Sequence, residues 1–181
     1  MQIMMKHLAS PNSKSQLMKV SRDGEGDMVP GFDEVQVQPN AIDLKVESLK
    51  LIDDATTFVI DEDKKLHRGS KPVSTEGGYW TLESGKRYEV IFEGIVNIAE
   101  GEAGWVITRS TLNRNGLFLT SGLYDSGYKG VMAGCLHVTS GPALIKKGTR
   151  LGQFILFDAE SLSSYDGDYG VDSEHDKKYD E

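Results

Sequence analysis

Short apolar runs separated by glycine-containing turns are the feature that most constrains the fold of this chain. Between residues 79 and 108 four such runs follow one another, at 79–82, 87–92, 95–98 and 104–107. Further runs lie at 117–119, 131–138, 143–145 and 154–157. Several short strands at this spacing are typical of antiparallel sandwiches and barrels. We therefore predict an all-β fold, a distorted β-barrel or jelly roll.

Two segments before these runs also favour β structure. Apolar and polar residues alternate at 35–38 and 42–46, which predicts strand, break and strand. Residues 53–78 are polar and rich in Gly and Ser around a short apolar run, so a hairpin or long surface excursion is expected there.

A single short helix is predicted at residues 110–116. Ser110 can cap its first turn, and Gly116 can end it. The two tryptophans, Trp80 and Trp105, are expected to fill the core of the β domain.

The chain has 181 residues, which is the usual size of a single domain. Residues 1–33 show no sustained hydrophobic period and are expected to form an N-terminal arm. Residues 34–160 carry the runs that predict the β domain. Residues 161–181 are rich in Ser, Asp, Gly and Tyr, so we expect a flexible acidic C-terminal tail.

Charge and cysteine content exclude several classes of partner. The formal net charge of -8 disfavours binding to a nucleic-acid backbone, which needs a basic surface. Cys135 is the only cysteine, so no internal disulfide forms, and this suits a cytoplasmic protein. No apolar run approaches the length that spans a bilayer, so no membrane partner is expected.

The first candidate for chemistry is Thr108–Arg114, where a strand end runs into the helix start. The first turn of a helix offers unpaired N–H groups, Ser110 and Thr111 add hydroxyl donors, and Arg114 can fork onto phosphate oxygens. A phosphate chain fits this arrangement. Taken alone, the segment fits a capped helix with solvated arginines better.

The second candidate is Gly122–Gly130, in which Asp125 stands among glycine-rich turn residues and Tyr128 follows it. A tight β-hairpin is predicted. Its backbone can read the edge of a base, Tyr128 can cover a sugar ring, and Asp125 can orient or deprotonate water. Taken alone, Asp125 also fits a turn aspartate that bonds its own backbone.

The third candidate is Lys146–Gln153, a basic turn before a strand that carries Arg150 and Gln153. Either side chain could meet a phosphate or a neighbouring subunit. The alternative is a solvated basic turn in which Arg150 pairs with a carboxylate.

Occurring together in this order, with Asn40–Leu44 before them and Tyr165–Gly170 after them, these segments resemble a known superfamily. It comprises the trimeric dUTP pyrophosphatases (dUTPases) and the dCTP deaminases, and the likeness is closest to the archaeal and viral dUTPase branch. It covers roughly residues 34–170. The resemblance implies a dUTPase-like β-clip fold, dUTP as substrate, and a homotrimer with active sites between subunits. It also implies Mg²⁺ held by the triphosphate and water, with no direct protein ligand.

The resemblance assigns a role to each matching residue. Asp125 would position the water that attacks the α-phosphorus, so that catalysis is mainly alignment and electrostatics. Asp43 would lie behind the ligand, near the Mg²⁺ waters, and Arg150 would brace its own strand. The remaining substrate-binding residues divide into a phosphate group and a pyrimidine group: Arg109, Ser110, Thr111, Arg114 and Gln153 for phosphate, and Ser121, Tyr128, Tyr165 and Tyr169 for the nucleoside or the closing tail.

Two departures from the superfamily pattern bear on the branch. The deaminases carry a glutamate on the strand after the hairpin, whereas Cys135 stands at that place here, with no catalytic role expected. The tail lacks the Gly-rich, Phe-containing closing motif of ordinary trimeric dUTPases. Its Tyr165–Gly170 segment resembles the closing segment of the archaeal and deaminase branches, and could order over the ligand.

Three functions follow, in order of preference. The first is a Mg²⁺-dependent dUTP diphosphatase that releases dUMP and pyrophosphate in the cytoplasm, that of a host cell if the source is viral. The second is a dCTP deaminase, alone or combined with diphosphatase activity. The third is a nucleotide-binding regulatory protein without turnover.

Overall fold

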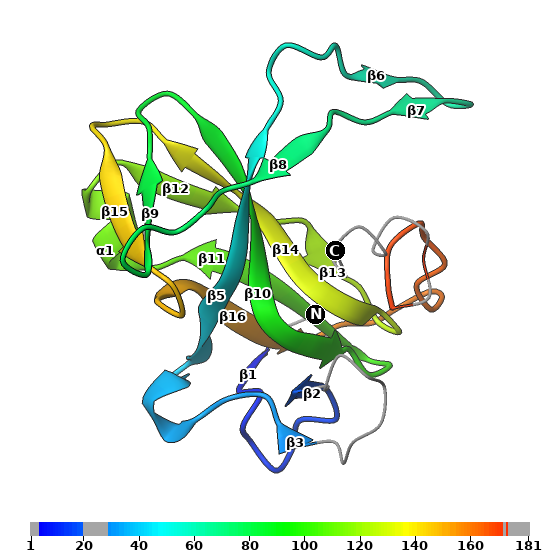
Figure 1. Ribbon diagram of the computed structural model, residues 1–181. Helices are drawn as coiled ribbons and strands as arrows, with labels where there is room; N and C mark the ends of the chain where they lie inside the picture. The colour runs from blue at the N-terminus through cyan, green and yellow to red at the C-terminus, as the bar shows by residue number, and fades with distance from the viewer. Residues whose placement is uncertain (1–3, 20–28, 172, 174–181) are drawn as a thin grey trace.

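The computed structural model describes residues 4–19, 29–171 and 173 (Figure 1). Strands dominate this part of the chain, together with one short α-helix and one 3-10 turn. In chain order the elements are β1 (Met5–Lys6), β2 (Gln16–Lys19), β3 (Val29–Pro30), η1 (Glu34–Gln36), β4 (Val37–Gln38), β5 (Ala41–Ile52), β6 (Val59–Ile60), β7 (Lys65–Leu66), β8 (Ser70–Pro72), β9 (Tyr79–Leu82), β10 (Arg87–Asn97), β11 (Glu102–Thr108), α1 (Ser110–Arg114), β12 (Leu117–Thr120), β13 (Leu123–Tyr124), β14 (Lys129–Val138), β15 (Ala143–Lys146) and β16 (Arg150–Asp158).

The main sheet has the strand order β12-β14-β10-β5-β16-β11-β13, with antiparallel neighbours. The register of β10 shifts between Ile91 and Ile95, and Gly94 there adopts a φ of 87°. Such bulges bend a strand and increase its twist. The sheet therefore curls into an open half-barrel (Figure 1), and the predicted all-β class with one short helix is confirmed.

The core lies inside the curl, where alternate residues of the long strands meet. Val46, Val90, Leu136 and Phe154, from four different strands, are at most 1% exposed. Alternation puts successive side chains on opposite faces, so one face of each strand is apolar. Packing is close between the neighbouring strands β11 and β16, because a Cβ atom on Gly104 would lie 2.1 Å from Cζ of Phe154.

Two local expectations are wrong. The strand predicted at 35–38 forms only at Val37–Gln38, as β4. Residues 34–36 instead form the 3-10 turn η1, in which the side chain of Gln36 turns inward, is 3% exposed, and donates to the carbonyl oxygen of Asp43. Trp80 is buried as expected, but Trp105 is 47% exposed because it lies on the outer face of β11.

The described residues of the N-terminal arm predicted for 1–33 are docked on the β body. Strand β1 pairs with β16, and β2 pairs with β10. Leu8, Leu17 and Met18 are each at most 7% exposed. Residues 1–3 and 20–28 of the expected arm lie outside the described part.

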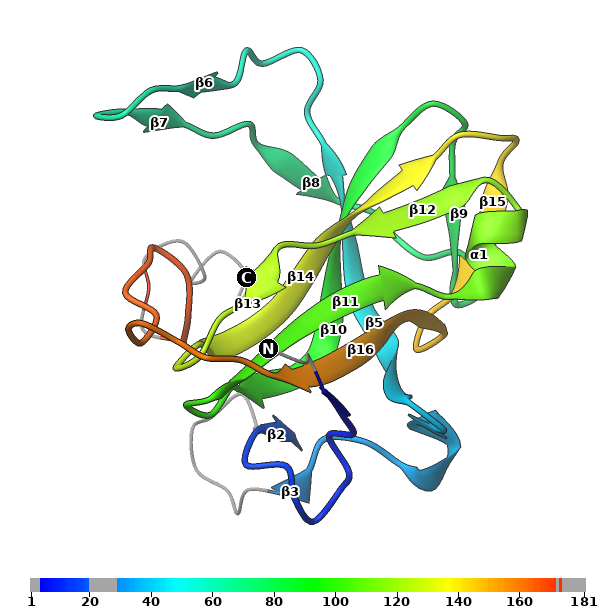
Figure 2. The ribbon, with the colours of Figure 1, turned by 180° about the vertical axis from the view of Figure 1, so that it is seen from behind.

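Residues 53–69 form the expected excursion. Strands β6 and β7 make a separate two-stranded hairpin that projects from the body, and β8 returns the chain to the edge of β5 (Figures 1 and 2). In the described residues no helix is long and apolar enough to cross a membrane.

The first half of the expected tail folds back onto the body. The N–H of Tyr165 donates to the oxygen of Ser126, and the N–H of Val171 donates to the oxygen of Lys129. Lys65 on the projecting hairpin pairs with Asp168 at 2.5 Å. Residues 172 and 174–181 of the expected tail lie outside the described part.

Candidate active site

The residues predicted for the phosphate side gather around Asp43, whose side chain on β5 is fully buried. Arg109 Nε lies 3.2 Å and Arg150 Nη1 3.3 Å from its Oδ2 atom. Gln153, its cross-strand partner, donates to Oδ1 over 3.1 Å. Because no well-aligned hydrogen bond from the described residues reaches Oδ2, charge holds the arginines there. A buried carboxylate needs such partners to replace water.

Two details bear on the roles predicted for Asp43 and Gln153, which remain predictions. Asp43 is fully buried, so in this conformation its carboxylate cannot touch the waters around a Mg²⁺ ion. The amide of Gln153 donates to Asp43, so one of its hydrogens is not available to a phosphate. Arg109 and Arg150 lie in bracing positions, because Arg109 donates to the carbonyl oxygen of Arg150 over 2.9 Å and Arg150 donates to that of Val35.

The helix α1 carries the exposed polar groups of this end. Ser110, Thr111 and Arg114 are all exposed. Arg109, not Ser110, is the N-cap residue, and it makes no side-chain cap. The predicted cap is therefore wrong, because the N–H of Arg109 still bonds to Leu151 in the sheet and keeps Arg109 extended.

The hairpin predicted at 122–130 is open rather than tight. Strand β12 pairs with β14 only as far as Thr120 and Cys135, and β13 then pairs with β11 instead. Only the turn itself is closed, by a bond from the N–H of Tyr128 to the oxygen of Asp125. The edge of β14 is thus left without a strand partner beside the turn.

A tyrosine hydroxyl occupies part of that edge. Tyr124 donates to the carbonyl oxygen of Ala133 over 2.9 Å and accepts from its N–H over 3.1 Å. Tyr128 donates to the oxygen of Val131 over 2.8 Å. These bonds satisfy backbone groups that would otherwise lie unpaired in the gap. The sequence did not single out Tyr124, and its place directly before Asp125 in the predicted hairpin was the only local signal.

The gap forms a pocket that brings the predicted tyrosines together. Tyr128, Tyr165 and Tyr169 line it with Tyr124 and the backbone of Gly122–Leu123, Val131 and Ala133. The Tyr128 ring lies 5.3 Å from that of Tyr165, edge to face. Aromatic walls and backbone polar groups are what a planar ring with a polar edge needs.

Asp125 lies beside this pocket. Its side chain is exposed and lines a neighbouring hollow, which shares Leu123 and Tyr165 with the tyrosine pocket. Ser121 lies further up the same segment, but its hydroxyl bonds to both backbone groups of Val106. The backbone after Ser121, rather than its hydroxyl, is therefore what faces the gap.

The two groups of predicted residues lie at opposite ends of β11. Tyr124 pairs with Gly104 near the start of the strand, whereas Arg109 and α1 follow its last residue, Thr108 (Figure 2). At about 3.3 Å per residue, Asp125 and Ser110 are roughly 20 Å apart. Groups that contact one phosphate, directly or through one water, must lie within roughly 10 Å of each other. Within one chain the two groups are therefore too far apart to contact the same phosphate.

An apolar row crosses the outer face of the sheet between these ends. Trp105 is 47% and Leu123 is 53% exposed. Both Leu123 and the half-buried Ile155 are cross-strand partners of Trp105. Contiguous apolar side chains on a surface favour contact with another protein surface.

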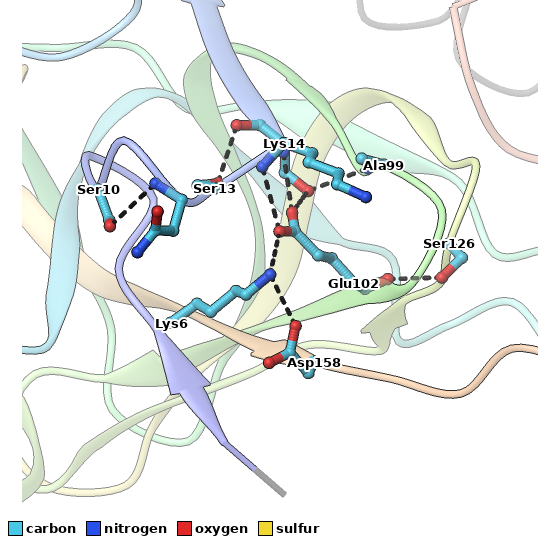
Figure 3. A network of polar contacts seen from close by, with 10 residues as sticks. Lys6, Ser10, Ser13, Lys14, Ala99, Glu102, Ser126 and Asp158 are labelled. Atoms are coloured by element: carbon cyan, nitrogen blue, oxygen red, sulfur yellow. Dashed lines mark hydrogen bonds and ion pairs between the residues drawn. The ribbon is translucent and has the colours of Figure 1, made fainter.

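A third polar cluster centres on Glu102 at the start of β11 (Figure 3). The sequence did not predict it. The Glu102 side chain is 1% exposed and accepts hydrogen bonds from Lys6, the N–H groups of Lys14 and Ser15, and the Ser15 hydroxyl. Burial raises the pKa of Glu102, but these donors outweigh burial and lower the pKa to about 2 from its usual 4.5. No local pattern around Glu102 signals this, because the donors lie some 90 residues away in the sequence.

Two further observations concern direct metal ligands and the cysteine. The described residues hold no group of three His, Cys, Asp or Glu side chains that could bind a metal ion. Cys135 is half-buried, and burial raises the pKa of its thiol. A thiol of raised pKa is a poor substitute for a carboxylate that shuttles protons.

The half-barrel, with basic groups at one end of β11 and an aromatic pocket at the other, suits a small all-β protein that binds an anionic ligand with a planar ring. The model of the dCTP deaminase-like family matches residues 12–159. The chain belongs to this family, as its resemblance to the dUTPase and deaminase superfamily led us to expect.

Relatives and a solved structure agree with this membership. The chain is 32% identical over 145 residues to a probable deoxyuridine 5'-triphosphate nucleotidohydrolase of Methanopyrus kandleri, covering 80% of this chain and 94% of the relative. It is 32% identical over 145 residues to a protein of the same name from Aeropyrum pernix, covering 78% and 89%. The 2'-deoxycytidine 5'-triphosphate deaminase of Agrobacterium tumefaciens shares the fold, with a TM-score of 0.55 at 20% identity. That match spans 77% of this chain but only 44% of the deaminase.

Proposed function

We propose that this protein is a dUTP diphosphatase, which hydrolyses dUTP to dUMP and pyrophosphate. The observation that carries the proposal is the exposed Asp125 beside a pocket lined by Tyr124, Tyr128, Tyr165 and Tyr169. The archaeal relatives, which are named as probable dUTP nucleotidohydrolases, support the choice of substrate.

In the proposed reaction the pyrimidine enters the tyrosine pocket and the triphosphate runs to the basic end of a neighbouring copy. Asp125 orients a water and accepts its proton as the water oxygen attacks the α-phosphorus. The bond from that phosphorus to the bridging oxygen breaks, and pyrophosphate leaves. Ser110, Thr111 and Arg114 donate to the phosphates, while Asp43 holds Arg109 in place.

Magnesium is part of this proposal only as an ion that arrives with the nucleotide. Because the described residues offer no three-ligand group, its oxygens would come from the triphosphate and water. When bound, the ion neutralises phosphate charge. Asp125 is the exposed carboxylate of the proposed site that could bond to its waters.

We further propose that the active protein is a homotrimer with sites between copies. The roughly 20 Å between Asp125 and Ser110 within one chain supports sharing. The apolar row of Trp105, Leu123 and Ile155 lies between the two halves of the site and would be covered by the neighbouring copy.

The primary test is Asp125→Asn. The amide keeps the size of the side chain but cannot accept the proton of water, so turnover should fall about 10²-fold or more while dUTP still binds. Pyrophosphate release and calorimetric binding of a non-hydrolysable dUTP analogue measure the two effects. Unchanged turnover in the folded variant would refute the assignment of Asp125.

A mixing experiment tests whether sites are shared. Asp125→Asn and Ser110→Ala chains, each inactive alone, are unfolded together at equal amounts and refolded. If one copy supplies Asp125 and its neighbour supplies Ser110, about a quarter of the sites should be intact and activity should return. A site within one chain would give no recovery, because no chain carries both residues.

The deaminase alternative is tested by substrate. Purified protein is incubated separately with dCTP and dUTP, with and without Mg²⁺, and ammonia and pyrophosphate are measured. We expect pyrophosphate from dUTP and no ammonia from dCTP, because Cys135 stands where a proton-carrying acid would be needed. Tight dUTP binding with no product over hours would instead favour a regulatory protein.

A further inference from the structure

The Glu102 cluster links the N-terminal segment to the turn that carries Asp125. On one side, the Glu102 carboxylate accepts from Lys6 over 2.9 Å, from the N–H of Ser15 over 2.8 Å and from the Ser15 hydroxyl. Lys6 also pairs with Asp158 at the end of β16, over 2.7 Å. Figure 3 shows the side chain of Lys6 between the carboxylates of Glu102 and Asp158, with a contact to each.

On the other side, residues 98–102 bond to the turn that carries Asp125. The hydroxyl of Ser126 donates to the carbonyl oxygen of Glu102 over 2.6 Å. Two backbone hydrogen bonds join Ile98 to the turn. The N–H of Gly127 donates to the oxygen of Ile98 over 2.9 Å, and the N–H of Ile98 donates to the oxygen of Tyr128 over 2.8 Å. The Ser126 hydroxyl also lies 2.5 Å from that of Ser161, at the start of the folded tail.

Residues 98–102 therefore lie between the N-terminal segment and the Asp125 turn. Ser15 bonds to this stretch at both ends, at Ala99 and at Glu102. Its hydroxyl accepts from the N–H of Ala99 over 3.0 Å while it bonds to the carboxylate of Glu102. Charge-assisted hydrogen bonds of a fully buried carboxylate are strong and directional. A shift of residues 98–102 would move Ser126, and with it the neighbouring Asp125.

We propose that Glu102 is a positioning residue, through which N-terminal residues 6–15 hold the Asp125 turn and the folded tail in their working places. The proposal rests on the proposed function for its catalytic consequence, but the brace itself is a property of the fold. It assigns a role to an N-terminal segment that sequence reasoning left without one.

The test is Glu102→Gln in the full chain. An amide of the same shape turns one acceptor into a donor facing Lys6 and the Ser15 groups, so the brace should loosen. We expect kcat for dUTP to fall about 10- to 100-fold because the attacking water is misplaced. KM should change less than about threefold, because groups elsewhere bind the phosphates and base. Asp54→Asn, an exposed acid paired with Lys86 and Arg87 far from the turn, is the matched control and should leave kcat unchanged.

Hydrogen exchange gives a readout that does not depend on activity. In Glu102→Gln the amides of Ala99, Gly127 and Tyr165 should exchange at least tenfold faster, while those of the central strand β5 keep their protection. Equal loss of protection in β5 would show a merely structural role and overturn the proposal. Unchanged exchange at the turn in a folded variant would overturn it as well.

Two milder variants keep the proposal testable if Glu102→Gln does not fold. Ser15→Ala removes the hydroxyl that joins Glu102 to Ala99, and Ser126→Ala removes the bond between the turn and Glu102. Each should raise exchange at Gly127 and lower kcat with little change in KM; wild-type values in both would contradict the brace. If the wild-type protein does not hydrolyse dUTP but the exchange pattern changes as described, the function fails and the brace stands.

Discussion

At the scale of single residues, two buried carboxylates organise the two ends of β11. Asp43 pairs with Arg109 and Arg150 and holds both side chains against the sheet. The exposed residues Ser110 and Arg114 lie on the helix that follows Arg109. Glu102 faces one lysine and several hydroxyl and N–H donors, and holds the turn of Asp125. Neither carboxylate is exposed to a ligand, so both act through their neighbours.

The lowered pKa of Glu102 predicts how stability depends on pH. The folded state holds the proton less tightly than the unfolded chain, whose pKa is near the usual 4.5. The contribution of Glu102 is therefore fully present above this value and is lost as the pH falls toward about 2. Between these limits the wild type should lose about 3 kcal/mol more unfolding free energy than Glu102→Gln.

Urea denaturation at steps of pH measures this difference. Other carboxylates titrate in both proteins and cancel in the comparison. Parallel stability curves for the wild type and Glu102→Gln would contradict the assignment of the lowered pKa.

At the scale of elements, the decisive feature is the open hairpin between β12 and β14. The pairing of β12 with β14 ends at Thr120, and the following strand β13 pairs with β11 instead. The gap that this leaves beside β14 is the tyrosine pocket. The hydroxyl of Tyr124 bonds to both backbone groups of Ala133, which would otherwise lie unpaired at the open strand edge. A gap of this kind supplies an aromatic wall and a polar strand edge at the same place.

The role of Tyr124 is tested by its change to Phe. The ring still packs beside Tyr128 and Phe154, but Ala133 loses its partner, so the unfolding free energy should fall by about 1–2 kcal/mol. Tyr79→Phe, at an exposed tyrosine of β9, is the control and should change it by less than about 0.5 kcal/mol. Chemical denaturation of both variants decides, and equal stability would remove Tyr124 from this role.

At the scale of the whole molecule, one chain presents two separate groups of predicted site residues and an exposed apolar row, which support the proposed sharing of sites between copies. The half-barrel keeps Asp125 and Ser110 at opposite ends of β11, so rotation of a second copy is the way to bring them together. Because the formal net charge is -8, an anionic nucleotide would have to bind at a local cluster of arginines.

The apolar row predicts the effect of Trp105→Lys. If this row is the interface of the proposed trimer, a charge there should dissociate the assembly to single chains and abolish dUTP hydrolysis, while the circular dichroism spectrum stays that of a β protein. Sedimentation measures the assembly. Tyr79→Lys, at a similarly exposed aromatic residue away from the row, should leave it intact. A Trp105→Lys protein that stays trimeric and active would place the interface elsewhere.

The sequence by itself determined the class of fold and the segments that carry chemistry. Strand periodicity, glycine turns and the local patterns around Ser110, Asp125 and Arg150 are properties of neighbouring residues, so they can be read along the chain. The family likeness rests on these same patterns.

Tertiary structure decided what depends on residues far apart. Only the pairing of strands could show that Trp105 faces outward, that Tyr124 bonds to Ala133 and that Glu102 meets Lys6 and Ser15. The distance between Asp125 and Ser110 likewise follows from the path of β11. The alternation of side chains along a strand predicts which residues share a face, but what each face packs against depends on the pairing of all strands in the sheet.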